Sequence, residues 1–203
     1  LIFYNGLHLE SKMIEIFEKM SKSKPTIAVT KTISKTKLTA PPEYDGFYDP
    51  HVWFDVSLWT SAAEVVKDSL IKLDPNNKTH YSTNFKNYKK KLIELDNWIK
   101  NEIKQIPKNK RYLVTAHDAF GYFASAYNFK VIGLQGINTA SEAGTKDIQN
   151  VTSIIIEKEV PTIFIESSVP IRTIKAVQAA VKAKGHHVDI GEELLTDALG
   201  QTG

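Results

Sequence analysis

The sequence predicts an α/β fold in which two doubly wound α/β lobes are joined by one long backbone helix. Segments with strand and helix patterns alternate along the 203 residues, an order typical of parallel sheets covered by helices. An amphipathic segment at residues 77–105 separates two such series. We therefore expect an N-terminal lobe at residues 1–106, which includes this helix, and a C-terminal lobe at residues 107–203.

The N-terminal lobe begins with a strand, a helix and a second strand. Residues 1–4 look like the end of a buried strand, and Asn5-Gly6 predicts a turn after it. Apolar residues at helical spacing predict an amphipathic helix at residues 8–20. Residues 25–30 then read as a short strand, and a loop rich in Lys, Thr, Pro and Gly follows at residues 31–50.

Two helices complete this lobe. The first starts at Asp55 and ends before Asp74-Pro75, because the residue preceding a proline is pushed out of the helical region. The second is the helix at residues 77–105, which spans ~40 Å at about 1.5 Å per residue and is ended by Pro107. Its apolar residues recur at steps of three and four: Tyr81, Phe85, Tyr88, Leu92, Leu95, Ile99 and Ile103.

The C-terminal lobe has the same alternation in a longer series. We expect strands at 112–115, 130–134, 162–165 and 187–190, and helices at 118–127, 145–158 and 171–184. This order predicts a parallel, doubly wound sheet. Ligands of such sheets collect outside the carboxyl ends of the strands, so functional residues are expected in the loops there.

Composition excludes several classes of protein. With 42% hydrophobic and 24% charged residues the chain is typical of a globular protein, and no apolar run approaches the ~18 residues that a membrane span needs. The absence of cysteine excludes a cysteine-based zinc site, a thiol nucleophile and disulfides. The densest basic run, Lys86–Lys91, lies on the expected solvent face of the long helix, so we expect no nucleic-acid binding.

Both ends of the sequence lead us to expect an internal piece of a longer protein. The first residues carry no basic n-region, apolar h-region or cleavage site, so we expect a leader upstream of Leu1. The last residues, 197–203, stop in a loop without a closing element.

Three loops carry side chains suited to binding a metal. His51 follows Asp49-Pro50 just ahead of a helix, His117 stands at the end of the strand that begins the second lobe, and Asp197 lies past the last strand. Taken singly, each is better explained as a capping, turn or ordinary polar residue than as a ligand. All three are expected at the strand-end openings of the two lobes, which favours a shared site.

Imidazole and carboxylate groups are the ligands expected for Zn²⁺, Mn²⁺ or Fe²⁺. We expect the histidines to be mostly neutral near pH 7, and protonation below pH ~6 to compete with the metal. Two histidines and one aspartate need at least one further ligand. The same set also suits catalytic zinc, which keeps a position open for water.

An enzyme would require a general base beside the metal, and the candidates are Asp118 and Glu142. Asp118 is equally explained by the start of a helix, where a carboxylate is favourable, and Glu142 by a loop. The sequence has no His-Glu-x-x-His motif, Gly-x-Ser-x-Gly elbow or P-loop. The remaining histidines, His8, His80, His186 and His187, are not expected to be ligands.

Six stretches of this sequence resemble the zinc/manganese-receptor class of periplasmic solute-binding proteins, the metal captors of ABC importers, and especially its TroA-like members. They are LIFYNGLHLE at 1–10, DPHVW at 49–53, TAHDAFGYF at 115–123, GLQGINTASEA at 133–143, IFIESS at 163–168 and TDALG at 196–200. The resemblance covers essentially the whole chain.

The resemblance implies two lobes bridged by a rigid helix, with one metal ion in the cleft between them. It assigns His51, His117 and Asp197 as ligands, and places the family's first ligand histidine ahead of Leu1. It further implies no enzymatic activity and delivery of the metal to a membrane ABC permease. The protein would be a monomer in the periplasm or lipid-anchored outside the cytoplasmic membrane.

The resemblance leaves the metal open between Mn²⁺ and Zn²⁺. Zinc-specialised members often carry a His- and acid-rich loop before the Asp-Pro-His segment, whereas residues 31–48 contain no histidine and only Glu43 and Asp45 as acids. This favours manganese or a mixed preference, although histidine ligands bind Zn²⁺ more tightly than Mn²⁺. A zinc-dependent hydrolase and a surface adhesin with the same fold are the alternative functions.

Overall fold

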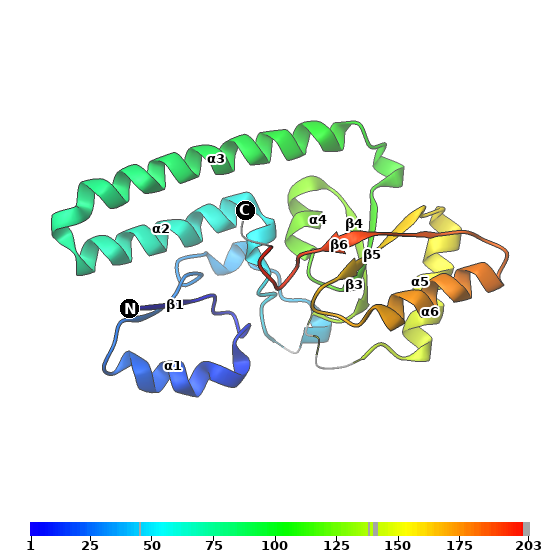
Figure 1. Cartoon of the computed structure of the whole chain (residues 1–203), viewed down its shortest axis with the longest axis horizontal. Helices are drawn as coiled ribbons and strands as arrows, with labels where there is room; N and C mark the ends of the chain where they lie inside the picture. Colours follow the sequence, from blue (N-terminus) through cyan, green and yellow to red (C-terminus); the bar gives the residue numbers. More distant parts are fainter. Residues whose placement is uncertain (45, 138, 140–141, 201–203) are drawn as a thin grey trace. The chain divides into compact units, whose positions relative to one another are not determined.

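The computed structural model describes residues 1–44, 46–137, 139 and 142–200 (Figure 1). Among the residues discussed above, Asp45, three positions of the 133–143 stretch (138, 140 and 141) and residues 201–203 lie outside this part of the chain. The chain divides into two compact units, Leu1–Gln105 and Ile106–Gly203. No helix among the described residues is long and apolar enough to cross a membrane.

The first unit starts with a parallel pair of short strands. β1 (Ile2–Tyr4) pairs with β2 (Thr26–Ala28), and α1 (Ile14–Ser21) connects them. The predicted helix at 8–20 thus begins later than expected. Leu7 and His8 have φ angles of 54° and 66°, and this left-handed backbone cannot belong to a right-handed helix.

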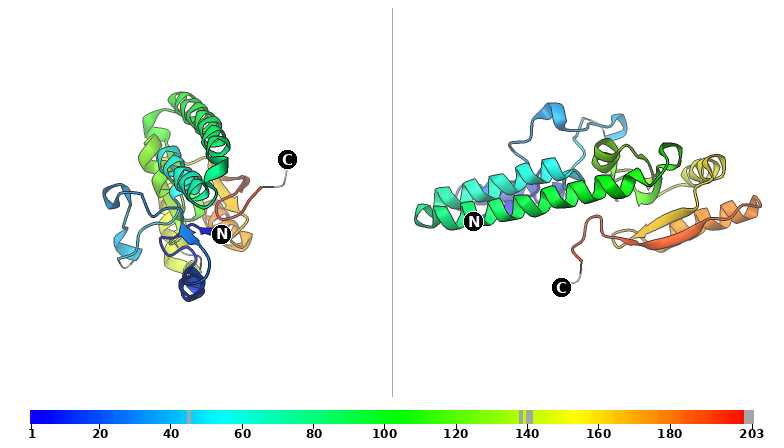
Figure 2. Two further views of the ribbon diagram at one scale, coloured as in Figure 1. Left: turned by 90° about the vertical axis from the view of Figure 1, so that its left-hand side faces the viewer. Right: turned by 90° about the horizontal axis from the view of Figure 1, so that it is seen from above.

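Two antiparallel helices form the rest of the first unit, apart from short 3-10 turns. α2 (Val56–Leu73) is capped by Asp55, whose Oδ1 accepts from the backbone N of Ser57 at 2.7 Å and of Leu58 at 3.2 Å. α3 (Lys78–Lys104) runs beside α2 in the views of Figures 1 and 2. Both helices lie within one or two residues of the predicted ranges.

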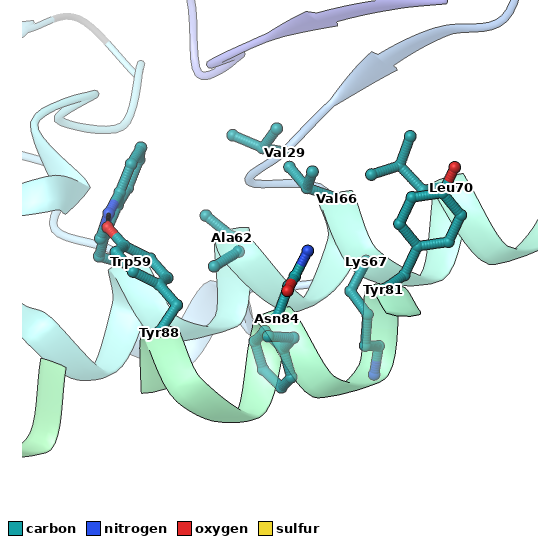
Figure 3. A pocket seen from close by; sticks show the side chains of 11 residues that line it. Val29, Trp59, Ala62, Val66, Lys67, Leu70, Tyr81, Asn84 and Tyr88 are labelled. Atoms are coloured by element: carbon teal, nitrogen blue, oxygen red, sulfur yellow. Dashed lines mark hydrogen bonds between the residues drawn. The ribbon is translucent and has the colours of Figure 1, made fainter. Parts of the chain in front are cut away.

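An apolar cavity of about 440 Å³ lies between α2, α3 and Val29 (Figure 3). Trp59 and Tyr88 border it, and the indole Nε1 donates a hydrogen bond to the Tyr88 hydroxyl at 2.9 Å. Lys67 is the charged residue of its lining, and no histidine or carboxylate of the described chain lines it. This hollow therefore lacks the donors of a transition-metal site.

The second unit is built on a four-stranded parallel sheet in the order β4-β3-β5-β6. The strands are β3 (Tyr112–His117), β4 (Lys130–Gln135), β5 (Thr162–Glu166) and β6 (Asp189–Leu194), and the helices are α4 (Gly121–Tyr127), α5 (Thr145–Lys158) and α6 (Ile171–Ala183). From β3 the chain moves first to β4 and then back past β3 to β5. Because parallel crossovers are right-handed, this reversal puts α4 on one face of the sheet and α5 and α6 on the other.

The core of this unit lies between the sheet and the helices α5 and α6. Val114, Ile163 and Val177 are fully buried, and the same cluster includes residues of α5 and α6 (Figure 1). The strand order also defines a switch point between β3 and β5, where the connections diverge. Ligands of open α/β sheets typically bind outside the carboxyl ends of the strands at such a point.

Two elements of this unit differ from prediction. The helix expected at 118–127 begins only at Gly121, because the backbone N of Asp118 donates to Gln135 O at 3.1 Å and continues the β3–β4 ladder. Asp118 is therefore not at a helix start. The last strand was expected at 187–190, but β6 runs from Asp189 to Leu194 alongside β5.

Candidate metal centre

His117 is the last residue of β3 and lies fully buried at the switch point of the sheet. Glu166, the last residue of β5, accepts from the backbone N of His117 at 3.0 Å and makes a short hydrogen bond with its ring Nδ1. Because a carboxylate only accepts, Nδ1 carries the proton of that bond. The lone pair of the neutral ring is therefore on Nε2, the atom that faces away from Glu166.

Asp197 supplies a carboxylate on the Nε2 side of His117. It lies in the loop after β6, with Oδ2 3.4 Å from His117 Nε2 and a side chain that is 27% exposed. Thr196, immediately before it, donates to Glu166 Oε2 at 2.9 Å and fixes the start of this loop. The second unit thus brings two of the three predicted ligands together.

His51 is placed by the first unit and is 1% exposed. Asp49 accepts from both its ring Nδ1 at 2.6 Å and its backbone N at 3.0 Å. The intervening Pro50 is anchored from the other end of the unit, since Asn5 Nδ2 donates to Pro50 O at 3.0 Å. The indole of Trp53 stands edge-on to the imidazole at 5.2 Å between ring centroids.

Asp49 and Glu166 orient two different histidines through the same pair of hydrogen bonds. Each carboxylate accepts from both the backbone N and the ring Nδ1 of its histidine, which orients the ring and, when the ring is neutral, puts the lone pair on Nε2. Both residues belong to the stretches that carry the family resemblance, but no role was predicted for either. An aspartate two residues before a histidine was a usable signal, whereas the Glu166 contact needs the strand order.

The protonation of His117 differs from the expectation of a neutral ring near pH 7. Burial by itself lowers the pKa of this imidazole, but hydrogen bonds and charge from Asp197 and Glu166 outweigh it and raise the pKa to about 9. In the metal-free protein the ring is therefore an imidazolium at neutral pH. A metal has to displace this proton across the whole neutral range, and not only below pH ~6.

The other candidates lie apart from these carboxylate–histidine pairs. Glu142 is exposed and forms an ion pair with Arg172. His8, His80, His186 and His187 are all exposed; His80 bonds to Asn84, and His187 bonds to Asp189.

The fold and the imidazole–carboxylate pairs agree with the zinc/manganese-receptor class of periplasmic solute-binding proteins that the sequence resembles. Residues 1–203 match the family described as zinc-uptake complex component A, periplasmic (ZnuA), and the chain belongs to this family. The resemblance found in the six sequence stretches is thereby confirmed.

The relatives that match this chain include proteins named for zinc binding and for manganese binding. The zinc-binding protein TroA of Treponema pallidum is 45% identical over 203 residues, and the manganese-binding lipoprotein MntA of Bacillus subtilis is 43% identical. Each alignment covers 100% of this chain but 65% and 66% of the relative, so the chain spans about two thirds of their length.

Solved structures confirm the predicted fold class. The periplasmic zinc-binding protein TroA from T. pallidum superposes with a TM-score of 0.96 at 45% identity, covering 100% of this chain and 72% of that one. A second TroA structure gives a TM-score of 0.92 at 38% identity, covering 100% and 73%.

Proposed function

We propose that this chain is the metal-capturing part of a solute-binding protein that takes up Mn²⁺ or Zn²⁺ and delivers it to a membrane ABC permease. The observation that carries the proposal is the buried His117, oriented by Glu166 and facing the carboxylate of Asp197. Family membership and the zinc and manganese names of the relatives support it.

One ion per chain is bound, with His51, His117 and Asp197 among its ligands. The support is that both histidines are buried and both have Nδ1 held by a carboxylate, which prepares Nε2 for a metal. His51 belongs to the first unit and the other two ligands to the second, so the ion would join the lobes. At least one more ligand completes the coordination.

The protein binds the metal and catalyses no reaction. A hydrolase needs a carboxylate or imidazole free to act as a general base on the metal-bound water. Asp49 and Glu166 are committed to histidine Nδ1 atoms, and Glu142 is paired with Arg172 at the surface. This commitment favours a receptor over a hydrolase.

The domain organisation and the location follow the same proposal. We place the boundary between the lobes at residue 106, with the long helix α3 in the N-terminal lobe, which the division after Gln105 supports. The protein works as a monomer, in the periplasm or lipid-anchored outside the cytoplasmic membrane, since relatives are periplasmic proteins or lipoproteins.

Metal analysis and competitive titration of Mn²⁺ and Zn²⁺ on the full-length protein test the proposal. Wild type is expected to bind one equivalent, and His117→Ala and Asp197→Ala are expected to lose or greatly weaken it. His187→Ala, which removes an exposed imidazole, is the matched control and should bind as wild type does. Unchanged stoichiometry and affinity in both ligand variants would mean that the site, and with it the receptor function, is wrong.

A further inference from the structure

Gln135 has a buried polar atom for which residues 1–44, 46–137, 139 and 142–200 supply no hydrogen bond. It is the last residue of β4 and is 6% exposed. Within the described part of the chain, its side-chain oxygen Oε1 is buried without a hydrogen-bond partner. Burying such an oxygen costs free energy, so its retention calls for an explanation, and an absent ion or water is one.

The sheet places Gln135 next to His117. β3 and β4 are parallel neighbours, with His117 opposite Gln135 in register, and such strands lie about 4.8 Å apart. On the other side of β3, Glu166 of β5 bonds His117. Gln135, His117 and Glu166 therefore form a row across the carboxyl ends of β4, β3 and β5.

The loop that leaves His117 covers the same face of β4 as the Gln135 side chain. Gly133 lies two residues before Gln135, so a side chain there would share its face. A Cβ added at Gly133 would lie 2.6 Å from the backbone N of Asp118. The turn after His117 thus folds closely over the face of β4 on which Gln135 lies.

We propose that Gln135 is a specificity-determining residue. Its side-chain oxygen contributes to the coordination of the captured ion and favours the binding of manganese over zinc. The inference rests on the proposed function and adds an oxygen donor to the histidine and aspartate ligands. Carbonyl oxygens suit Mn²⁺, whereas Zn²⁺ is satisfied by four ligands and gains less from another. The oxygen either binds the ion directly or accepts a hydrogen bond from a water molecule bound to the ion.

The test compares Gln135→Met and Gln135→Glu in the full-length protein. Met has a similar shape but no oxygen, and should weaken Mn²⁺ binding about 10–100-fold, the usual effect of losing a group that supports metal ligands. Zn²⁺ binding should fall by less than about threefold. Glu keeps an oxygen at the same place and should hold Mn²⁺ affinity within about threefold of wild type. Competitive titration against a chromophoric chelator measures all of these.

Calorimetric melting of the metal-free protein separates this role from a structural one. Because the lost oxygen has no hydrogen-bond partner among the described residues, Gln135→Met should leave the Tm of the metal-free protein unchanged or raise it. Gln178→Met is the matched control: Gln178 Nε2 donates to Val188 O at 2.9 Å, so this variant should lower the Tm without changing either metal affinity.

Three outcomes would overturn the inference. Equal weakening of both metals in Gln135→Met, no weakening of either, or a loss of metal-free Tm as large as that of Gln178→Met would each exclude a specificity role. If wild type binds neither metal while remaining folded, the proposed function itself fails, and this result is distinct from the other three.

Discussion

At the residue scale, the proposed site depends on carboxylates that orient its histidines. Glu166 is 3% exposed and accepts from the His117 backbone, its ring and the Thr196 hydroxyl. Asp49 holds His51 in the same way within the first unit. Such partners orient the ring and raise the basicity of the nitrogen that binds the metal.

Glu166→Gln should weaken binding of either metal about 10–100-fold, because the amide keeps the shape but loses the charge that favours the bound ring. In the metal-free protein the same variant should lower the pKa of His117, since Glu166 is one of the two groups that raise it. Competitive titration and the pH dependence of the imidazole NMR signals measure the two effects. Glu157→Gln, at an exposed carboxylate, is the control, and equal behaviour of the two variants would contradict the role of Glu166.

The raised pKa of His117 predicts how the metal-free protein responds to pH. Its folded-state pKa of about 9 exceeds the ordinary value of 6.5, so the protonated ring stabilises the fold fully below pH 6.5 and this contribution is lost as pH rises to about 9. Metal affinity should rise over the same window, by about tenfold per pH unit. Urea unfolding and titration at several pH values measure both. A metal-free stability that does not fall between these limits would contradict the assignment.

At the scale of elements, the predicted limits were right where residues within or next to a helix determine where it begins and ends. α5 has the predicted bounds, and α2 starts at the cap that Asp55 provides. The predicted limits of an element were wrong where residues distant in sequence determine them. For example, α4 starts late because the backbone N of Asp118 bonds to β4. The three proposed ligands were predicted from their positions at strand ends and in loops, whereas the hydrogen bond between His117 and Glu166 joins residues 49 apart and has no periodic signal.

The close approach of β4 and the turn after His117 predicts a requirement for glycine. Gly133→Ala would put a Cβ 2.6 Å from Asp118 N, and the neighbour is backbone that cannot swing away. We expect a loss of about 1–3 kcal/mol in the free energy of unfolding, as for other overpacked positions, together with weaker metal binding. Urea denaturation of the metal-free protein measures the first. Gly136→Ala is the control, since no residue that the structure describes lies within 4 Å of its added Cβ, and a similar loss there would contradict the steric argument.

At the scale of the whole molecule, the proposed ligands come from both compact units, His51 from the first and His117 and Asp197 from the second. A single ion would then act as a link between them. A ligand that binds only the folded state stabilises it by mass action, about 4 kcal/mol when its concentration is 1,000 times the dissociation constant.

This link predicts slower hydrogen exchange in both units when metal is added. Backbone amides near His51 and near His117 should gain protection together, and a chelator should remove it from both. Mass spectrometry of peptides from residues 49–55 and 115–121 measures the change. In His117→Ala neither segment should respond, and protection of the second segment alone in wild type would exclude His51 as a ligand.

The carboxylates around His117 also determine how capture changes the charge of the protein. At neutral pH the metal-free ring carries a proton, since its pKa is about 9, and the ion takes the place of that proton. A divalent ion then adds close to one net positive charge, and not two. Migration in isoelectric focusing should shift accordingly, and the heat of binding should vary with the ionisation enthalpy of the buffer that accepts the released proton.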